Sequence, residues 1–126
     1  AMGMYALLSN TGGNVNTAVG AFALQNNTIG SANSALGKDA LKVNTTGSSN
    51  VAVGYQTLFS NTTGSNNVAI GYASLNLNTI GGQNTAVGFG SLQNNTTNNN
   101  SAFGYKALNA NTTGTNNTAV GRNTSV

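Results

Sequence analysis

Apolar and polar positions along the chain follow one short pattern that returns at a nearly constant interval. Each copy contains Ala, an apolar residue and then Gly, as in Ala52–Gly54 and Ala69–Gly71. A Leu follows four residues after most of these glycines, and an Asn-Thr pair begins three residues after the Leu. Successive copies are 17 residues apart, except for a 16-residue interval between Gly88 and Gly104. Because the pattern keeps its register, it predicts a repetitive structure rather than a disordered segment.

Residues at equal offsets form columns in this scheme. The leucine column contains Leu7, Leu24, Leu41, Leu58, Leu75, Leu92 and Leu108. The glycine column includes Gly54, Gly71 and Gly88. An asparagine column includes Asn27, Asn44, Asn61 and Asn78, and a second asparagine lies four residues before each later glycine. If equal offsets stack, identical amides can hydrogen-bond along the stack.

The length of the repeat selects the type of fold. A 17-residue unit is too short for a helical hairpin, which needs more than about 30 residues, and no apolar pattern has the 3.6-residue period of a helix. We therefore expect an all-β, parallel β-solenoid with about 17 residues per coil. Residues 1–126 would form a single repeat domain of about seven coils, on the order of 35 Å long at the usual strand spacing.

The composition of each unit suggests where the chain extends and where it bends. The main strand is predicted around Asn67–Tyr72 and its equivalents, with a second short extended stretch around each Leu. The segment Asn61–Gly64 is the predicted bend, because Gly and Asn tolerate positive φ and Asn and Thr side chains close local turns. In the 16-residue unit Asn98 replaces the bend glycine, and Asn is the best non-glycine residue for a left-handed position.

The two faces of the predicted strand both lack charged residues in most copies. Strand side chains alternate, so Ala and Gly share one face, while Thr, Val or Ser, then an aliphatic residue, then usually an aromatic residue share the other. One face can line the interior of the coil, and the other favours self-association, with a homotrimer as the expected assembly. The alternative is a narrow monomeric roll in which small residues let two walls approach. Neither terminus has a polar cap, which indicates a fragment of a longer fibre.

Charge and reactive groups are nearly absent. Charged residues make up 4% of the chain, with four Lys or Arg, one Asp and no His, Cys, Pro, Trp or Glu. General acid–base catalysis and metal binding need several such groups, so we expect no enzyme activity, no cofactor and no metal site. The four cations are too scattered for nucleic-acid binding, and no apolar run has the length of a membrane span.

Aromatic residues directly follow the glycine in four successive copies: Tyr55, Tyr72, Phe89 and Tyr105. Lys38 and Arg122 occupy the same offset in other copies, which implies that the position reaches solvent. A ladder of rings at such an edge is a candidate receptor-binding site that could stack on sugars. The alternative is that the rings pack on one another or on a neighbouring chain.

The segments Asn50–Gly54 and Asn67–Gly71 resemble the head repeat of trimeric autotransporter adhesins, and the whole phrase is also similar to repeats in phage and virus fibres. The resemblance extends over essentially the whole chain, although the head unit of those adhesins is shorter than 17 residues. It implies a left-handed parallel β-roll, three chains side by side, and display on a bacterial surface.

From these features we expect a structural segment of a trimeric surface fibre or adhesin, a bacterial virulence factor or a viral tail fibre. It would lie on the extracellular surface of a bacterium or on a virion, and project or form a surface that binds a host receptor or glycan, with no contact to membrane or nucleic acid. The alternative is an ice-binding β-solenoid, suggested by the regular series Thr11, Thr28 and Thr45.

Overall fold

The computed structural model of the chain describes residues 1–125, and within them only strands, turns and bends occur. The seven three-residue strands are β1 (Thr17–Val19), β2 (Ser34–Leu36), β3 (Val51–Val53), β4 (Val68–Ile70), β5 (Thr85–Val87), β6 (Ser101–Phe103) and β7 (Thr118–Val120). They form one parallel sheet in chain order, and the register pairs equivalent residues, such as Ala52 with Ala69. The predicted β-solenoid with about 17 residues per coil is confirmed.

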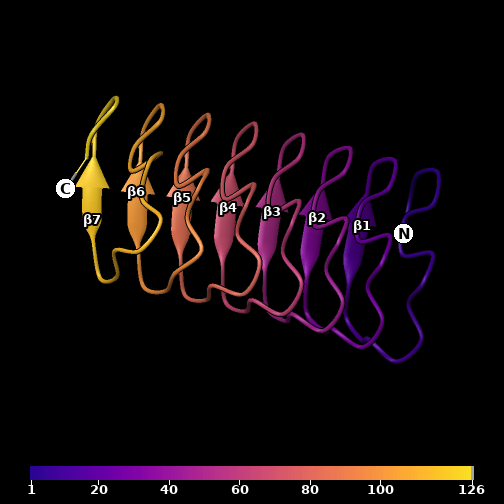
Figure 1. Cartoon of the computed structure of the whole chain (residues 1–126). Helices are drawn as coiled ribbons and strands as arrows, with labels where there is room; N and C mark the ends of the chain where they lie inside the picture. The colour runs from indigo at the N-terminus through magenta and orange to yellow at the C-terminus, as the bar shows by residue number, and fades with distance from the viewer. Residues whose placement is uncertain (126) are drawn as a thin grey trace.

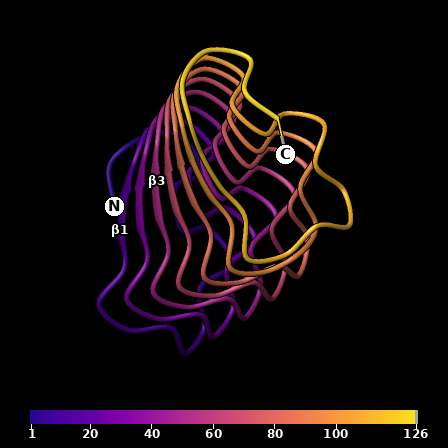
Figure 2. The same ribbon diagram turned by 90° about the vertical axis from the view of Figure 1, so that its left-hand side faces the viewer.

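The coils are stacked along one axis. Figure 1 shows the seven strands as a row of parallel arrows, with the two termini at opposite ends of the row. The perpendicular view in Figure 2 shows successive coil outlines lying over one another with a gradual offset. Each strand contacts only the strands of adjacent coils, as in other solenoid proteins. Stability therefore comes from interfaces between neighbouring coils rather than from one central core.

The apolar interior is built around two columns, with Ala23, Ala40 and Ala107 buried beside them. The middle residue of each strand is Ala, and Ala52 and Ala69 are fully buried. Leu24, Leu41, Leu58, Leu75 and Leu92 are also fully buried, Leu108 is nearly so, and Leu7 packs on the same cluster at the first coil. The leucine column predicted from the spacing is therefore present, and the Ala face of the strand is the inner one.

The chain does not extend around the leucines, so the prediction of a second extended stretch there is wrong. Leu58 and Leu75 lie in a turn and have left-handed φ values of 48° and 49°. Such a conformation is unfavourable for Leu. Here burial of the side chain and a hydrogen bond to the next coil stabilise it, since the Leu58 N–H donates to the Ser74 carbonyl at 3.1 Å.

The role predicted for the bend glycines is also wrong. Gly64 and its equivalents do not have positive φ. They are glycine because an added Cβ would overlap the Asn61 Oδ1 atom and the carbonyl of the next coil. The left-handed residue of the bend lies two positions later, at Asn66 with φ 61°. In the 16-residue unit the left-handed residue is accordingly Asn99, with φ 60°, and not Asn98.

The predicted amide ladder runs along the inside of the stack. The Nδ2 atom of Asn44 donates to Asn27 Oδ1 at 2.7 Å, and Asn61 donates to Asn44 in the same way at 2.8 Å. Asn78 donates to Asn61 at 3.0 Å. Each Nδ2 also donates to the glycine carbonyl three residues later, as Asn61 does to Gly64 at 2.9 Å. The buried amides thus bond to one another and to the backbone of their own bends.

A second asparagine column lies just before the strands and bonds differently. The backbone N–H of Asn67 donates to Asn50 Oδ1 at 3.0 Å, and its Nδ2 donates to the Gly81 carbonyl at 2.9 Å. Asn50 and Asn67 are fully buried. Because buried polar groups are costly without partners, these two columns bind the polar interior of each coil to the next.

The 16-residue unit interrupts the first ladder. Asn95 Nδ2 donates to the Thr97 carbonyl at 2.8 Å and makes no bond to Asn78. The Asn78 Oδ1 atom is consequently buried without a hydrogen-bond partner. The ladder resumes one coil later, where Asn111 donates to Asn95 Oδ1 at 2.6 Å. One missing residue therefore leaves one unsatisfied carbonyl in the core.

Inserting one glycine between Thr97 and Asn98 should stabilise the protein. The insertion recreates the Asn-Thr-Thr-Gly bend of the other units and lets Asn95 donate to Asn78. We expect a gain of about 1–2 kcal/mol, because a buried unsatisfied acceptor acquires a partner. Thermal unfolding monitored by circular dichroism would show a melting temperature several degrees higher. The control is the same insertion after Thr63, which makes an 18-residue coil and should lower the melting temperature.

Candidate functional site

The side of the sheet that faces away from the core is a nearly uncharged surface, which we call the outer face. It consists of the first and third residues of every strand. The first residues are Thr17, Ser34, Val51, Val68, Thr85, Ser101 and Thr118. The third residues are Val19, Leu36, Val53, Ile70, Val87, Phe103 and Val120. Alternation along each strand directs these side chains outward, because the residue between them is the buried Ala.

Large apolar side chains on the outer face are accessible to solvent. Leu36 is 50% exposed, and Ile70 and Phe103 are each 40% exposed. These residues belong to one row parallel to the stack axis, since the register pairs them through consecutive strands. Contiguous exposed apolar rows of this kind mark interaction surfaces. The outer face is therefore the first candidate for binding another molecule.

The four aromatic residues form a stacked ladder beside the outer face, which we call the aromatic stripe (Tyr55, Tyr72, Phe89 and Tyr105). The ring centroids of Tyr72 and Phe89 are 4.8 Å apart with an interplanar angle of 10°. Phe89 and Tyr105 are 5.2 Å apart at 17°, and Tyr55 is tilted by 41° from Tyr72 at 5.6 Å. The rings are between 38% and 46% exposed. The rings pack on each other, as one of the two expectations had it, and still reach solvent, while binding of a receptor stays a prediction.

The ring geometry determines what the aromatic stripe presents. The spacing along the ladder is close to the distance between strands, so the inner rings cover each other's faces. Their edges and the phenol hydroxyls remain accessible. A sugar cannot stack on the faces of Tyr72 or Phe89, but it can contact the edges and hydrogen-bond to the hydroxyls.

Three of the four cations lie against the aromatic stripe. Lys38 Nζ is 5.6 Å from the centroid of the Tyr55 ring. At the other end, Lys106 Nζ and Arg122 Cζ are each 5.5 Å from the centroid of Tyr105. The sequence pattern placed Lys38 and Arg122 at this offset but missed Lys106. The only signal for Lys106 in the sequence was that it directly follows Tyr105.

The fourth cation, Lys42, lies elsewhere and is paired. Its Nζ atom is 3.1 Å from Asp39 Oδ1, and Asp39 is the single acidic residue of the chain. Asp39 Oδ1 accepts no well-directed hydrogen bond, so the charge of Lys42 compensates this buried oxygen. Lys42 Nζ also lies 4.6 Å from the Phe22 ring centroid. Phe22 stacks on Tyr5 at 5.5 Å in a second, shorter aromatic cluster.

The threonine series that suggested ice binding is engaged in bonds within the protein. Thr28 Oγ1 donates to the Thr45 carbonyl at 3.0 Å, and Thr45 Oγ1 donates to the Thr62 carbonyl at 3.0 Å. Thr11 makes the same contact with Thr28 at 3.2 Å. These hydroxyl hydrogens bridge adjacent coils.

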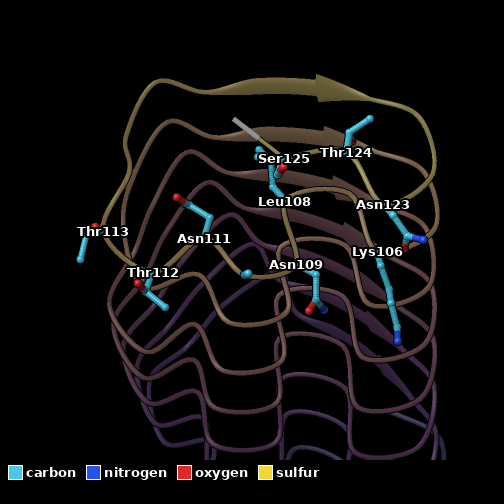
Figure 3. Close-up of a pocket in the computed structure, with 10 residues that line it drawn as sticks. Lys106, Leu108, Asn109, Asn111, Thr112, Thr113, Asn123, Thr124 and Ser125 are labelled. Atoms are coloured by element: carbon cyan, nitrogen blue, oxygen red, sulfur yellow. The ribbon is translucent and has the colours of Figure 1, made fainter.

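The C-terminal end of the stack is hollow. A cavity of about 390 Å³ is lined there by Leu108, Asn111, Thr124 and neighbouring residues. Figure 3 shows these side chains on the last coils of the stack. Leu108 and Asn111 belong to the leucine and asparagine columns, which the next coil covers elsewhere in the stack. The cavity is therefore the open interior of a coil rather than a separate site.

Chemical groups for catalysis are sparse in the part that the structure describes. Residues 1–125 contain no cluster of three or more His, Cys, Asp or Glu side chains that could hold a metal ion. Among the same residues no helix is long and apolar enough to cross a membrane.

No family model, curated protein or solved structure matches the chain. What the molecule does must therefore be inferred from its own geometry.

Proposed function

We propose that the chain is the rod-forming segment of a surface fibre, either a bacterial adhesin head or a viral tail fibre. Three copies of the left-handed coil lie side by side in this arrangement, and the assembly is displayed on the extracellular surface of a bacterium or on a virion. The segment either projects the fibre from that surface or itself forms a surface that binds a host receptor.

The observation that supports this proposal is the outer face. Neither of its two rows contains a charged residue in any of the seven strands, and the row of third residues is aliphatic or aromatic throughout, whereas five of the seven first residues are Ser or Thr. An antiparallel or parallel sheet face exposed to water normally carries polar and charged side chains, whereas faces covered by other elements are aliphatic. Among residues 1–125 no other element covers the outer face, and in Figure 2 the strands labelled β1 and β3 lie at the margin of the coils. Sister copies are the natural cover for a surface that repeats with the same period.

The columns of the interior favour a mechanical role. Adjacent coils are connected by parallel backbone bonds, by buried leucine contacts and by asparagine ladders, the first of which the 16-residue unit interrupts. Such a stack is extended, and its stability does not depend on disulfides, since the chain has no cysteine. A rod of this kind suits a fibre that must keep its shape outside a cell.

The mass of the protein in solution tests the proposal. Light scattering coupled to size-exclusion chromatography should give three times the mass of one chain. Replacing Ile70 with Lys on the outer face should yield the mass of a single chain with an unchanged circular dichroism spectrum, because a cation without a partner opposes burial in the interface.

The matched control is Thr63→Lys, which adds the same charge at an exposed position in the bend, away from the outer face. This variant should remain trimeric. A wild-type protein that stays monomeric at micromolar concentration would contradict the proposed assembly.

A further inference from the structure

The unpaired charges of the protein lie along the aromatic stripe. The formal net charge is +3, from four cations and one carboxylate. Lys42 and Asp39 neutralise each other. The remaining charges are those of Lys38, Lys106 and Arg122, and all three side chains contact rings of the aromatic stripe. The aromatic stripe therefore carries the whole net charge of the side chains.

A second copy of the chain cannot neutralise this stripe. Its single carboxylate is already paired and is only 8% exposed, so it has no acidic side chain to offer. Placing two or three such stripes in contact would bring like charges together in a desolvated interface, which is unfavourable. The aromatic stripe must stay at the edge of any self-interface, and its partner must bring negative charge of its own.

The ring geometry narrows the chemistry of that partner. Nucleic acid bases bind aromatic side chains by stacking on free ring faces. The faces of Tyr72 and Phe89 cover each other at 4.8 Å, so stacking of successive bases is blocked along the ladder. What remains accessible is a line of ring edges, the hydroxyls of Tyr55, Tyr72 and Tyr105, and cations at both ends. These groups suit a chain of hydroxyl-bearing rings with attached carboxylates.

We propose that the aromatic stripe binds an acidic polysaccharide laid along the axis of the stack. The inference deepens the proposed function, since it names the class of receptor that the fibre would recognise. Lys38 and Arg122 lie five coils apart, which is roughly 24 Å at the usual strand spacing. A polysaccharide of this length places carboxylates at both ends, and its hydroxyls bond to the tyrosines between them.

Binding can be measured with a fluorescently labelled polygalacturonate long enough to span the stripe, by anisotropy at low salt. The wild-type protein should bind it, and binding should weaken as salt rises, because exposed charges are screened. Replacing Lys38, Lys106 and Arg122 together with Gln should weaken binding about tenfold or more. Tyr72→Ala, at a position that is 46% exposed, should also weaken binding without unfolding the protein.

The control compares two variants with the same net charge. Arg122→Gln removes a cation from the stripe and should weaken binding about two- to fivefold. Thr63→Glu lowers the net charge by the same amount at an exposed position in the bend, outside the stripe, and should leave binding unchanged. Neutral dextran should not bind, and single-stranded oligothymidine should bind more weakly than polygalacturonate.

Three results would overturn the proposal. Equal losses from Thr63→Glu and Arg122→Gln would show that only net charge matters. Tighter binding of oligothymidine would identify the stripe as a nucleic-acid surface. No binding of polygalacturonate would remove the glycan site. The mass of each sample shows whether the glycan site or the fibre assembly has failed. A monomer that binds polygalacturonate would contradict the assembly only, and a trimer that does not bind it would contradict the glycan site only.

Discussion

Replacing Asn61 with Asp should destabilise the protein by about 4 kcal/mol at neutral pH, although the two side chains have nearly the same shape. Asn61 is fully buried, and its Nδ2 atom donates to Asn44 Oδ1 and to the Gly64 carbonyl. In the variant a carboxylate oxygen would face these two acceptors. The other carboxylate oxygen keeps the donor from Asn78, but a buried charge that faces two acceptors still costs several kcal/mol. Urea unfolding followed by circular dichroism measures the loss.

The control for this prediction is Asn66→Asp, which makes the same chemical change at an exposed residue. Asn66 has left-handed φ, which Asp also tolerates, so its free energy of unfolding should change by less than about 0.5 kcal/mol. Acid should restore part of the stability of Asn61→Asp, because protonation of the new carboxyl removes the charge and supplies a donor. Equal effects of the two substitutions would contradict the buried amide ladder.

Replacing Gly71 with Ala should cost about 3–5 kcal/mol. Gly71 has φ +117°, a region that L-residues rarely adopt, and an added Cβ would lie 2.8 Å from the carbonyl carbon and oxygen of Gly88. Relieving the overlap requires the two coils to separate where the Gly88 N–H donates to the Ile70 carbonyl at 2.8 Å. Hydrogen exchange should show lost protection at β4 and β5 together with a lower melting temperature.

Gly12→Ala is the matched control for Gly71→Ala. Gly12 does not have positive φ, and an added Cβ would meet only Ile29 Cγ2, at an ordinary contact distance of 3.5 Å. We expect a change of less than about 0.5 kcal/mol, or a slight gain from the reduced entropy of the unfolded chain. Equal losses in the free energy of unfolding for the two alanine variants would contradict the close approach of successive coils at Gly71.

The prediction of stacked coils succeeded because a repeat creates the same environment in every coil. Residues that recur at equal spacing, such as Gly54 and Gly71, are expected to lie in equivalent surroundings. Stacking one coil on the next provides these surroundings, and it pairs Ala52 with Ala69. The same argument predicted the amide ladder through Asn44 and Asn61, since an amide that recurs at the coil spacing can hydrogen-bond to the equivalent amides of the adjacent coils.

The local conformation of the bends was not predictable in the same way. Intrinsic preference assigns left-handed positions to Gly and Asn, yet Leu58 adopts one and Gly64 does not. Contacts between coils outweigh preference at both places. Leu58 gains a buried position and a bond to Ser74, while Gly64 must lack a side chain because Asn61 and the next coil occupy that space.

By itself, the sequence determined that the chain is all-β, that its coils repeat every 17 residues and that Leu, Asn and Gly form columns, because periodicity is a property of the residue order. Only the tertiary structure decided which face of the strand is inside. It also showed that Lys38, Lys106 and Arg122 meet one aromatic stripe. The reason is geometric: residues as far apart in the chain as Lys38 and Arg122 share a surface only after the coils are stacked.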